Sequence, residues 1–285
     1  MRFALVFATA SLLAATWLDD VNSFRAQREA RLKAPDGWLA VAGLFWLHEG
    51  ANTVGSDAKS DVVLPAGTPA RTAILRVAAG KVTLEPEPRA RLLLNGKPAS
   101  KAVLVTDIAD KPDLLQLGQL TLTIIDRNGK PGVRLRDPNA ETRRSFTGLN
   151  WYPAEPAWRI KAKWVAYPMP HKIRITNIVG MTDEEPAPGY AEFAVKGQTV
   201  RLEPVIDDDG SLFFMFKDAT SGHSTYGAGR FLEEVRPRDG VVELDFNKAT
   251  NPPCVFTAYA TCPLPPKQNV LTVAIEAGEK RYGNH

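Results

Sequence analysis

The sequence predicts a mainly β protein with one short N-terminal helix. After Trp38, short runs of β-branched and aromatic residues alternate with clusters of Gly, Pro, Asn and Asp, which is typical of antiparallel sheets. Helical periodicity is confined to the segment before Pro35. The length of 285 residues suits two domains. We therefore expect a helix over residues 17–37, a β-sandwich over 38–150 and a second antiparallel β-sandwich or barrel over 151–285.

The first 16 residues resemble a secretory signal peptide. Arg2 precedes the apolar run from Phe3 to Leu13, which ends in the small residues Ala14 and Ala15. A signal predicts a periplasmic or secreted protein. The alternative is an apolar first helix of a cytoplasmic protein. No later stretch has the roughly 20 apolar residues of a transmembrane helix, so we expect no membrane span in the mature chain.

A helix is predicted from Asp19 to Lys33. Asp19 and Asp20 place negative charge at its start, which favours a helix N-terminus. Val21, Phe24 and Leu32 lie near one face of such a helix. The sequence Pro35-Asp36-Gly37 then ends it.

Turn sequences divide the remainder of the chain into strands. Asn95-Gly96 and Asn128-Gly129 suit tight hairpins because both residue types tolerate positive φ. The segment from Trp151 to Trp158 carries two prolines, and a residue before proline avoids helix. We therefore expect an extended crossing between the two domains there.

Charge and motifs exclude several classes of function. Lys and Arg total 35 against 32 Asp and Glu, and no dense basic stripe is present, so we expect no nucleic-acid partner. No GxxxxGK[ST], GxGxxG or HExxH sequence occurs, and the four histidines are not at ligand spacing. We therefore predict no cofactor and no metal ion.

The densest group of polar residues lies between Phe216 and Glu279. A loop rich in glycine and hydroxyl groups follows an aromatic strand, and its small residues let backbone N–H groups approach a ligand. Arg230 can hold an anion. The same loop also fits an Ω-loop whose Ser and Thr side chains bond their own backbone. Under the first interpretation the ligand-binding residues are Asp218, Ser221, His223, Tyr226, Arg230, Asp245, Asn247 and Asn251.

Two late segments alternate with a period of two. Val242, Leu244 and Phe246 alternate with polar residues that include Asp245, and a strand is also expected over 270–276. If these strands are neighbours, Asp245 and Glu276 share a face and can act as acid and base. His223 is a further catalytic candidate. The alternative is that this face simply meets water.

Cys254 and Cys262 are separated by a short loop that is stiffened by prolines. In an exported protein a disulfide is the natural interpretation, worth about 2–4 kcal/mol. Two free thiols, or a metal pair with His223, are the alternatives.

Several motifs together resemble the bacterial family called domain of unknown function 1684. The likeness covers nearly the whole chain after the signal segment, and it implies no established activity. Its motifs include Gly43-Leu44-Phe45-Trp46-Leu47, Trp151-Tyr152-Pro153, Gly229-Arg230-Phe231-Leu232, Asp245-Phe246-Asn247, Asn251-Pro252-Pro253-Cys254 and Cys262-Pro263-Leu264-Pro265-Pro266.

The predicted first domain also resembles a degenerate forkhead-associated (FHA) β-sandwich. The resemblance lies in Val54-Gly55-Ser56, Leu94-Asn95-Gly96 and Leu117-Gly118. The FHA pattern requires an Arg where Ser56 stands, and a Ser followed by His that is missing near Thr72. A phosphate would lose most of its charge-assisted donors. The resemblance therefore implies the sandwich and not phosphopeptide binding.

Three functions follow as hypotheses. The leading one is a module in the C-terminal domain that binds a small molecule or polymer. The second is a hydrolase-type enzyme that uses Asp245 and Glu276, or His223, as acid and base. The third is a structural or assembly factor of the cell envelope, which would present an exposed apolar patch in place of a pocket.

Overall fold

A computed structural model describes residues 4–207, 209–234 and 236–283. The protein is mainly β and has several sheets, which confirms the predicted fold class. The chain divides into two compact units. Leu32–Phe146 and Thr257–Ala260 form one, which we call the sandwich unit. Residues up to Arg31, Thr147–Phe256 and the residues from Thr261 onward form the other, which we call the C-terminal unit.

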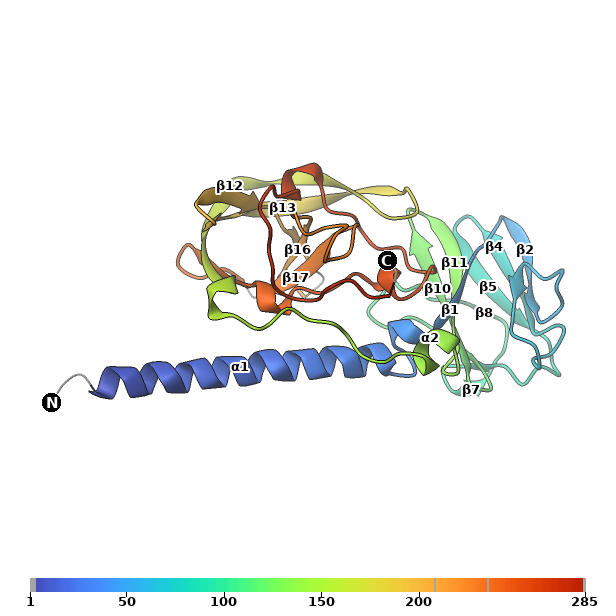
Figure 1. The fold of residues 1–285 in the computed structure, drawn as a ribbon. Helices are drawn as coiled ribbons and strands as arrows, with labels where there is room; N and C mark the ends of the chain where they lie inside the picture. Colours follow the sequence, from blue (N-terminus) through green and yellow to red (C-terminus); the bar gives the residue numbers. More distant parts are fainter. Residues whose placement is uncertain (1–3, 208, 235, 284–285) are drawn as a thin grey trace. The chain divides into compact units, whose positions relative to one another are not determined.

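The sandwich unit contains a six-stranded and a five-stranded sheet (Figure 1). In order across the first sheet lie β1 (Val41–Trp46), β11 (Lys130–Arg136), β10 (Leu120–Arg127), β9 (Leu114–Leu117), β6 (Leu93–Leu94) and β7 (Lys97–Pro98). The second has β3 (Val62–Val63), β2 (Gly50–Gly55), β4 (Ala73–Ala78), β5 (Lys81–Pro86) and β8 (Ala102–Val103). The helical segments are η1 (Trp38–Ala40) and α2 (Glu141–Arg144).

Both sheets of the sandwich unit contribute to one core. Leu75 and Leu84 of one sheet and Leu122 and Ile124 of the other are almost fully buried in the same cluster. Leu75 and Leu84 alternate with more exposed neighbours along their strands, as a half-buried sheet requires, whereas β10 is buried continuously from Leu122 to Ile125. The predicted hairpin at Asn128-Gly129 joins β10 to β11, with φ of 56° and 74° at the two turn residues.

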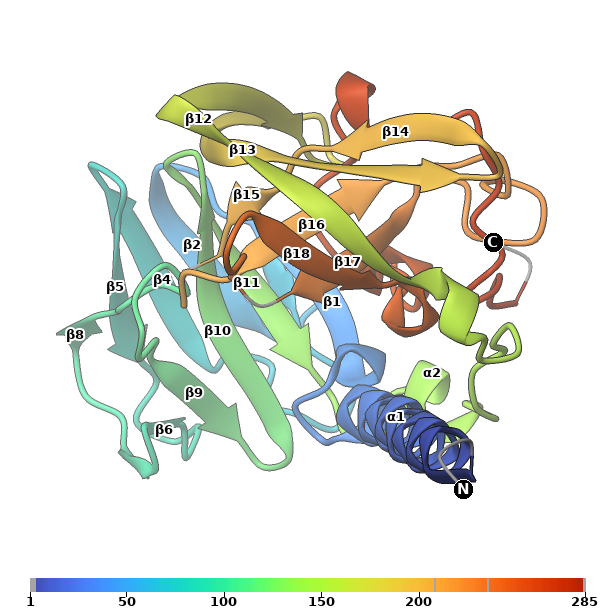
Figure 2. The same cartoon turned by 90° about the vertical axis from the view of Figure 1, so that its left-hand side faces the viewer.

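The C-terminal unit is built from a four-stranded and a three-stranded sheet. The first has the order β14 (Gln198–Leu202), β13 (Thr182–Val195), β12 (Arg159–Thr176) and β18 (Val241–Asp245). The second has β15 (Val205–Ile206), β16 (Leu212–Phe216) and β17 (Arg230–Glu234). Figure 2 shows β12 and β13 as a long twisted ribbon. Short 3₁₀ turns are η2 (Pro156–Trp158), η3 (Phe246–Lys248), η4 (Pro253–Val255) and η5 (Lys267–Asn269).

The helix predicted from Asp19 to Lys33 lies within a longer helix, α1 (Ala4–Lys33), which ends before residues 34–37 of the segment assigned to the helix. Its second half runs along the extended segment that precedes β12 (Figure 1). Arg25 donates to the carbonyl of Tyr152 at 3.0 Å, and the Leu149 N–H donates to Glu29 at 2.9 Å. Of the predicted signal segment, residues 1–3 lie outside the described residues. No helix in the described part of the chain combines the length and apolarity needed to cross a membrane.

The strand predicted over 270–276 is wrong in form, although its side-chain alternation is right. The segment forms no strand of a described sheet: Val270 makes an isolated bridge to Lys217, and the backbone bends at Thr272 and Val273. It is tied instead to the loop after β16, where the Leu271 N–H donates to Lys217 O at 2.8 Å and the Ala219 N–H to Val273 O at 3.0 Å. Val273 and Ile275 are buried in the core, whereas Glu276 is exposed. An extended chain alternates its side chains with or without a ladder.

Candidate functional site

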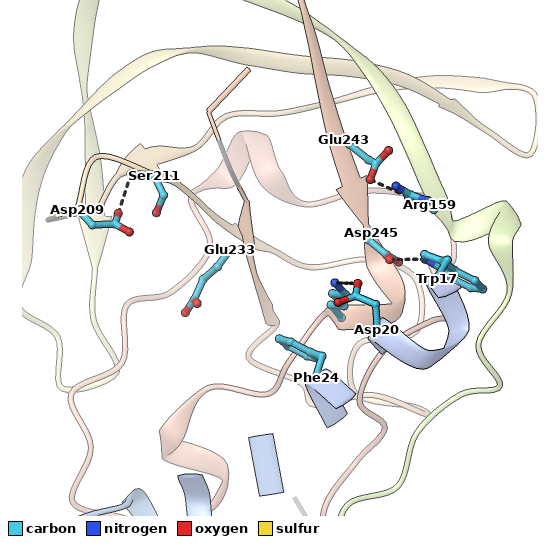
Figure 3. A pocket seen from close by; sticks show the side chains of 10 residues that line it. Trp17, Asp20, Phe24, Arg159, Asp209, Ser211, Glu233, Glu243 and Asp245 are labelled. Atoms are coloured by element: carbon cyan, nitrogen blue, oxygen red, sulfur yellow. Dashed lines mark hydrogen bonds and ion pairs between the residues drawn. The ribbon is translucent and has the colours of Figure 1, made fainter. Parts of the chain in front are cut away.

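An open cleft of about 380 Å³ lies within the C-terminal unit (Figure 3). Its walls come from the second half of α1, the start of β12, the end of β17, strand β18 and the turn before β16. The volume falls in the range of small-ligand pockets, which is roughly 300–1,000 Å³. The lining residues are Trp17, Asp20, Phe24, Arg159, Asp209, Ser211, Glu233, Glu243, Asp245 and Lys248.

Helix α1 covers the polar face at the end of β18. Alternation along β18 directs Val242 and Leu244 into the core and Asp245 to the other face. Trp17 packs over that face, and its indole Nε1–H donates to Asp245 Oδ2 at 2.8 Å. Asp245 is consequently only 5% exposed. Asp245, which the sequence placed on a face for solvent or ligand, therefore forms the floor of the cleft.

Two ion pairs neutralise part of the wall. Arg159 Nε lies 2.7 Å from Glu243 Oε1, across the antiparallel pair of β12 and β18. Lys248 pairs with Asp20 of α1. The Lys248 ammonium also lies 5.7 Å from the centre of the Phe24 ring, which is within the range of a cation–π contact. The Phe24 ring therefore already accommodates a cation at this wall.

Two further carboxylates, those of Glu233 and Asp209, belong to the lining of the cleft. Glu233 is exposed and forms no ion pair within the described part of the chain. Asp209 accepts the Ser211 N–H at 2.8 Å, and this backbone hydrogen bond keeps the pKa of Asp209 below its ordinary value. Among the described lining residues, five carboxylates face the two cations Arg159 and Lys248. Figure 3 shows Glu233 between the Asp209 turn and the α1 residues.

Asp218 and Arg230, two of the predicted ligand-binding residues, form an ion pair elsewhere, in a closed cluster. Arg230 Nη2 donates to Asp218 Oδ2 at 3.1 Å and to Ile275 O at 2.8 Å, and Nη1 donates to Ala277 O. Arg230 is 1% exposed, and burial lowers its pKa. The Asp218 carboxylate also accepts the Ile275 N–H at 2.7 Å and the Thr220 hydroxyl at 2.6 Å.

This cluster ties three segments of the unit together. The turn after β16 provides Asp218, β17 provides Arg230, and the segment 275–277 provides backbone partners. Apart from the buried Arg230 Nε, which has no hydrogen-bond partner among the described residues, the donors and acceptors of the cluster are directed at one another, as in the interior of a fold. The Thr220 and Ser221 hydroxyls both donate to the Asp218 carboxylate, and the Asp218 N–H donates to Ser221 Oγ, so these hydroxyl groups bond within the loop itself.

The remaining predicted ligand-binding residues are distributed among separate contacts. Asn247 is fully buried and joins Asp245 to the backbone of Glu155. Asn251 is buried beside Glu279, whose carboxylate accepts the Asn251 N–H at 2.8 Å. His223 is exposed on the loop after β16.

The structure separates the two carboxylates predicted to share a face. Asp245 is buried under Trp17, whereas Glu276 is exposed and pairs with Lys196 at 3.0 Å. The expectation rested on neighbouring strands, and the segment that carries Glu276 is not a strand.

Both cysteines are free thiols and lie close together. The Cys254 N–H donates to Cys262 Sγ at 3.2 Å, and the Tyr226 hydroxyl lies 3.6 Å from Cys254 Sγ. The disulfide considered from the sequence is not formed here. No group of three or more His, Cys, Asp or Glu side chains among the described residues is arranged to hold a metal ion.

A second hollow of about 510 Å³ lies between β12 and the proline-rich segment that follows Cys262. Arg174 and Lys267 give it positive charge, and Ile173 and Leu264 give it an apolar wall. Its lining includes none of the predicted ligand-binding residues.

Most cleft residues were missed by sequence reasoning. Of the predicted site residues only Asp245 lines the cleft. Trp17, Asp20 and Phe24 recur at intervals of three and four residues, which places them on one side of a helix. The presence of a tryptophan and an aspartate beside Phe24 on that side was the available sequence signal that the helix contributes residues to a site as well as to packing.

Comparisons with known proteins agree with part of the sequence analysis. Residues 144–280 match the family described as "Protein of unknown function (DUF1684)", which supports the predicted family over that part of the chain. A comparison with curated proteins gives no match. Among solved structures, the chain is similar to the solution NMR structure of an uncharacterized protein from Haloarcula marismortui. The identity is 29%, the match covers 50% of this chain and 81% of that chain, and the TM-score is 0.42.

Proposed function

We propose that the C-terminal unit is a binding module and that the cleft beside α1 takes a small organic cation. The observation that carries the proposal is the composition of the cleft wall, in which five carboxylates outnumber two cationic side chains around a space of about 380 Å³. A ligand that brings positive charge relieves the repulsion between these carboxylates. Partly enclosed charges are also screened less by salt than charges on an open surface.

The aromatic wall supports an organic cation over a simple inorganic one. Phe24 already lies within cation–π distance of the Lys248 ammonium. Glu233 provides a carboxylate without an ion pair among the described residues. Such a combination suits an alkylammonium or guanidinium group, in which apolar atoms accompany the charge.

Thermal-shift measurements test the proposal with choline, putrescine and agmatine as probes. Each cation is compared at low salt with an uncharged counterpart, which for choline is the alcohol in which carbon replaces the quaternary nitrogen. We expect the cations to raise the melting temperature in a saturable way. Equal shifts for choline and its uncharged counterpart would contradict the proposal.

Two Glu→Gln variants test whether the cation binds at the cleft. Glu233→Gln removes one carboxylate charge from the cleft, and we expect it to weaken binding of the best cation several-fold. Glu184→Gln is the matched control, because Glu184 is an exposed glutamate of β13 that pairs with Lys172 away from the cleft. Equal affinities in the two variants would mean that any cation binding is nonspecific attraction to surface charge.

A further inference from the structure

Cys254 and Cys262 are held together by the backbone around them. Cys254 lies in the 3₁₀ turn η4, which begins at Pro253, and its N–H donates to Cys262 Sγ at 3.2 Å. The Cys262 carbonyl accepts the Ile178 N–H at 2.9 Å, which fixes that residue against the end of β12. These backbone hydrogen bonds therefore hold the two thiols next to each other, although no disulfide joins them.

The two cysteines differ in access. Cys262 is 4% exposed and belongs to the buried part of the unit, whereas Cys254 is partly exposed. A reagent from solution therefore reaches Cys254 first. Once Cys254 carries a bound group, Cys262 is the thiol beside it.

Tyr226 provides a donor for the more accessible thiol. Its hydroxyl lies 3.6 Å from Cys254 Sγ, and burial raises the pKa of Tyr226, so the phenol keeps its proton at neutral pH. Hydrogen bonds from Cys262 and Tyr226 lower the pKa of the Cys254 thiol to about 7 against the opposing effect of burial. Near neutral pH a large fraction of Cys254 is therefore thiolate, which is the reactive form.

We propose that Cys254 and Cys262 form a reactive dithiol that is oxidised by low-molecular-weight disulfides, with Cys254 as the attacking thiol and Cys262 as the resolving thiol. This site does not depend on the cation cleft, because the lining of the cleft includes neither cysteine nor Tyr226.

The reaction proceeds by two thiol–disulfide exchanges. The Cys254 thiolate attacks one sulfur of a disulfide RSSR, the S–S bond breaks, and RS⁻ leaves and takes a proton. Cys262 then loses its proton and attacks Cys254 Sγ of the mixed disulfide. A bond forms between the two cysteine sulfurs, the bond from Cys254 to SR breaks, and a second RSH leaves. The protein dithiol is oxidised by two electrons, and RSSR is reduced to two RSH.

Intact-protein mass spectrometry with oxidised glutathione tests this order of events in the full chain. We expect the wild-type protein to lose the mass of two hydrogen atoms and to recover it in excess reduced glutathione. Cys262→Ser is expected to accumulate a single glutathione adduct on Cys254. Cys254→Ser is expected to gain an adduct at least about tenfold more slowly, because a buried thiol reacts poorly. Equal adduct rates in the two variants would overturn the assignment.

A second measurement uses the wild-type protein and therefore tests the proposal even if a cysteine variant fails to fold. Brief alkylation of wild-type protein followed by peptide mapping is expected to label Cys254 before Cys262, with a rate that rises through a midpoint near pH 7. Tyr226→Phe is expected to move this midpoint upward and to slow labelling at neutral pH several-fold. First labelling of Cys262, or an oxidised form that reduced glutathione cannot reopen, would overturn the proposal in favour of a purely structural pair.

Discussion

Asp218 and Asp245 are equally buried, at 5% exposure each, yet they have different surroundings. Asp218 follows β16 and accepts hydrogen bonds from Arg230, Ile275, Thr220 and Ser221. Asp245 ends β18, accepts from Trp17 and Asn247, and borders an open cleft. Burial alone therefore does not separate a structural carboxylate from one at a candidate site. The difference is whether hydrogen-bond partners surround the carboxylate on all sides or leave one side of it facing a cleft.

The closed cluster gives the largest expected effect on stability. Arg230→Ala leaves the Asp218 carboxylate buried without its cation, and breaking a buried pair in this way costs about 3–5 kcal/mol. Equilibrium denaturation in urea measures the loss. Arg159→Ala is the matched control in the cleft wall, where a partly exposed pair contributes about 1 kcal/mol or less. Similar losses in both variants would remove the distinction between the two regions.

The floor of the cleft is tested by Trp17→Phe. The substitution keeps an aromatic ring over β18 but removes the N–H that bonds Asp245, so we expect a loss of about 1.5–3 kcal/mol, as for a hydrogen bond to a charged group. The neighbouring Leu18→Ala is the control, because Leu18 is 41% exposed. A Trp17→Phe protein as stable as wild type would mean that α1 does not hold this carboxylate.

Much of the fold follows from local sequence patterns. The helix over 19–33, the hairpin at Asn128-Gly129 and the buried alternation of Val242 and Leu244 depend on periodicity and turn chemistry, and all are present. These features are local, so a single sequence contains the information for them.

The candidate site depends on contacts between distant residues, which local patterns do not encode. Trp17 and Asp245 are 228 residues apart, and no periodicity relates them. Arg230 was interpreted as an anion-binding residue because its loop is rich in small residues. The structure gives it Asp218 and two carbonyls as partners, and residue type alone could not distinguish these partners from a ligand.

Glu279 is a third buried carboxylate of the C-terminal unit and interacts electrostatically with Arg230. It makes the stability of this unit dependent on pH. Burial raises the pKa of Glu279 above its ordinary value of 4.5 despite the pairing with Arg28. The folded state therefore holds this proton more tightly than the unfolded state does, so the stabilisation is present below the ordinary pKa and is lost as the pH rises through the folded-state pKa. We expect melting temperatures of Glu279→Gln to fall less over this pH rise than those of the wild type. Parallel profiles would contradict the assignment.

The smallest effect is expected at Glu276, which follows Ile275 directly. The Ile275 N–H bonds Asp218 in the closed cluster, while alternation turns the Glu276 side chain outward to Lys196. Glu276→Gln should therefore change the free energy of unfolding by no more than about 0.5 kcal/mol, and a double-mutant cycle with Lys196→Gln should give a similarly small coupling. It should also leave cation binding unchanged, because Glu276 does not line the cleft. Loss of cation binding in Glu276→Gln would mean that Glu276 lies beside Asp245 in the cleft, as the acid–base hypothesis requires. The separation of the closed cluster from the open cleft would then be wrong.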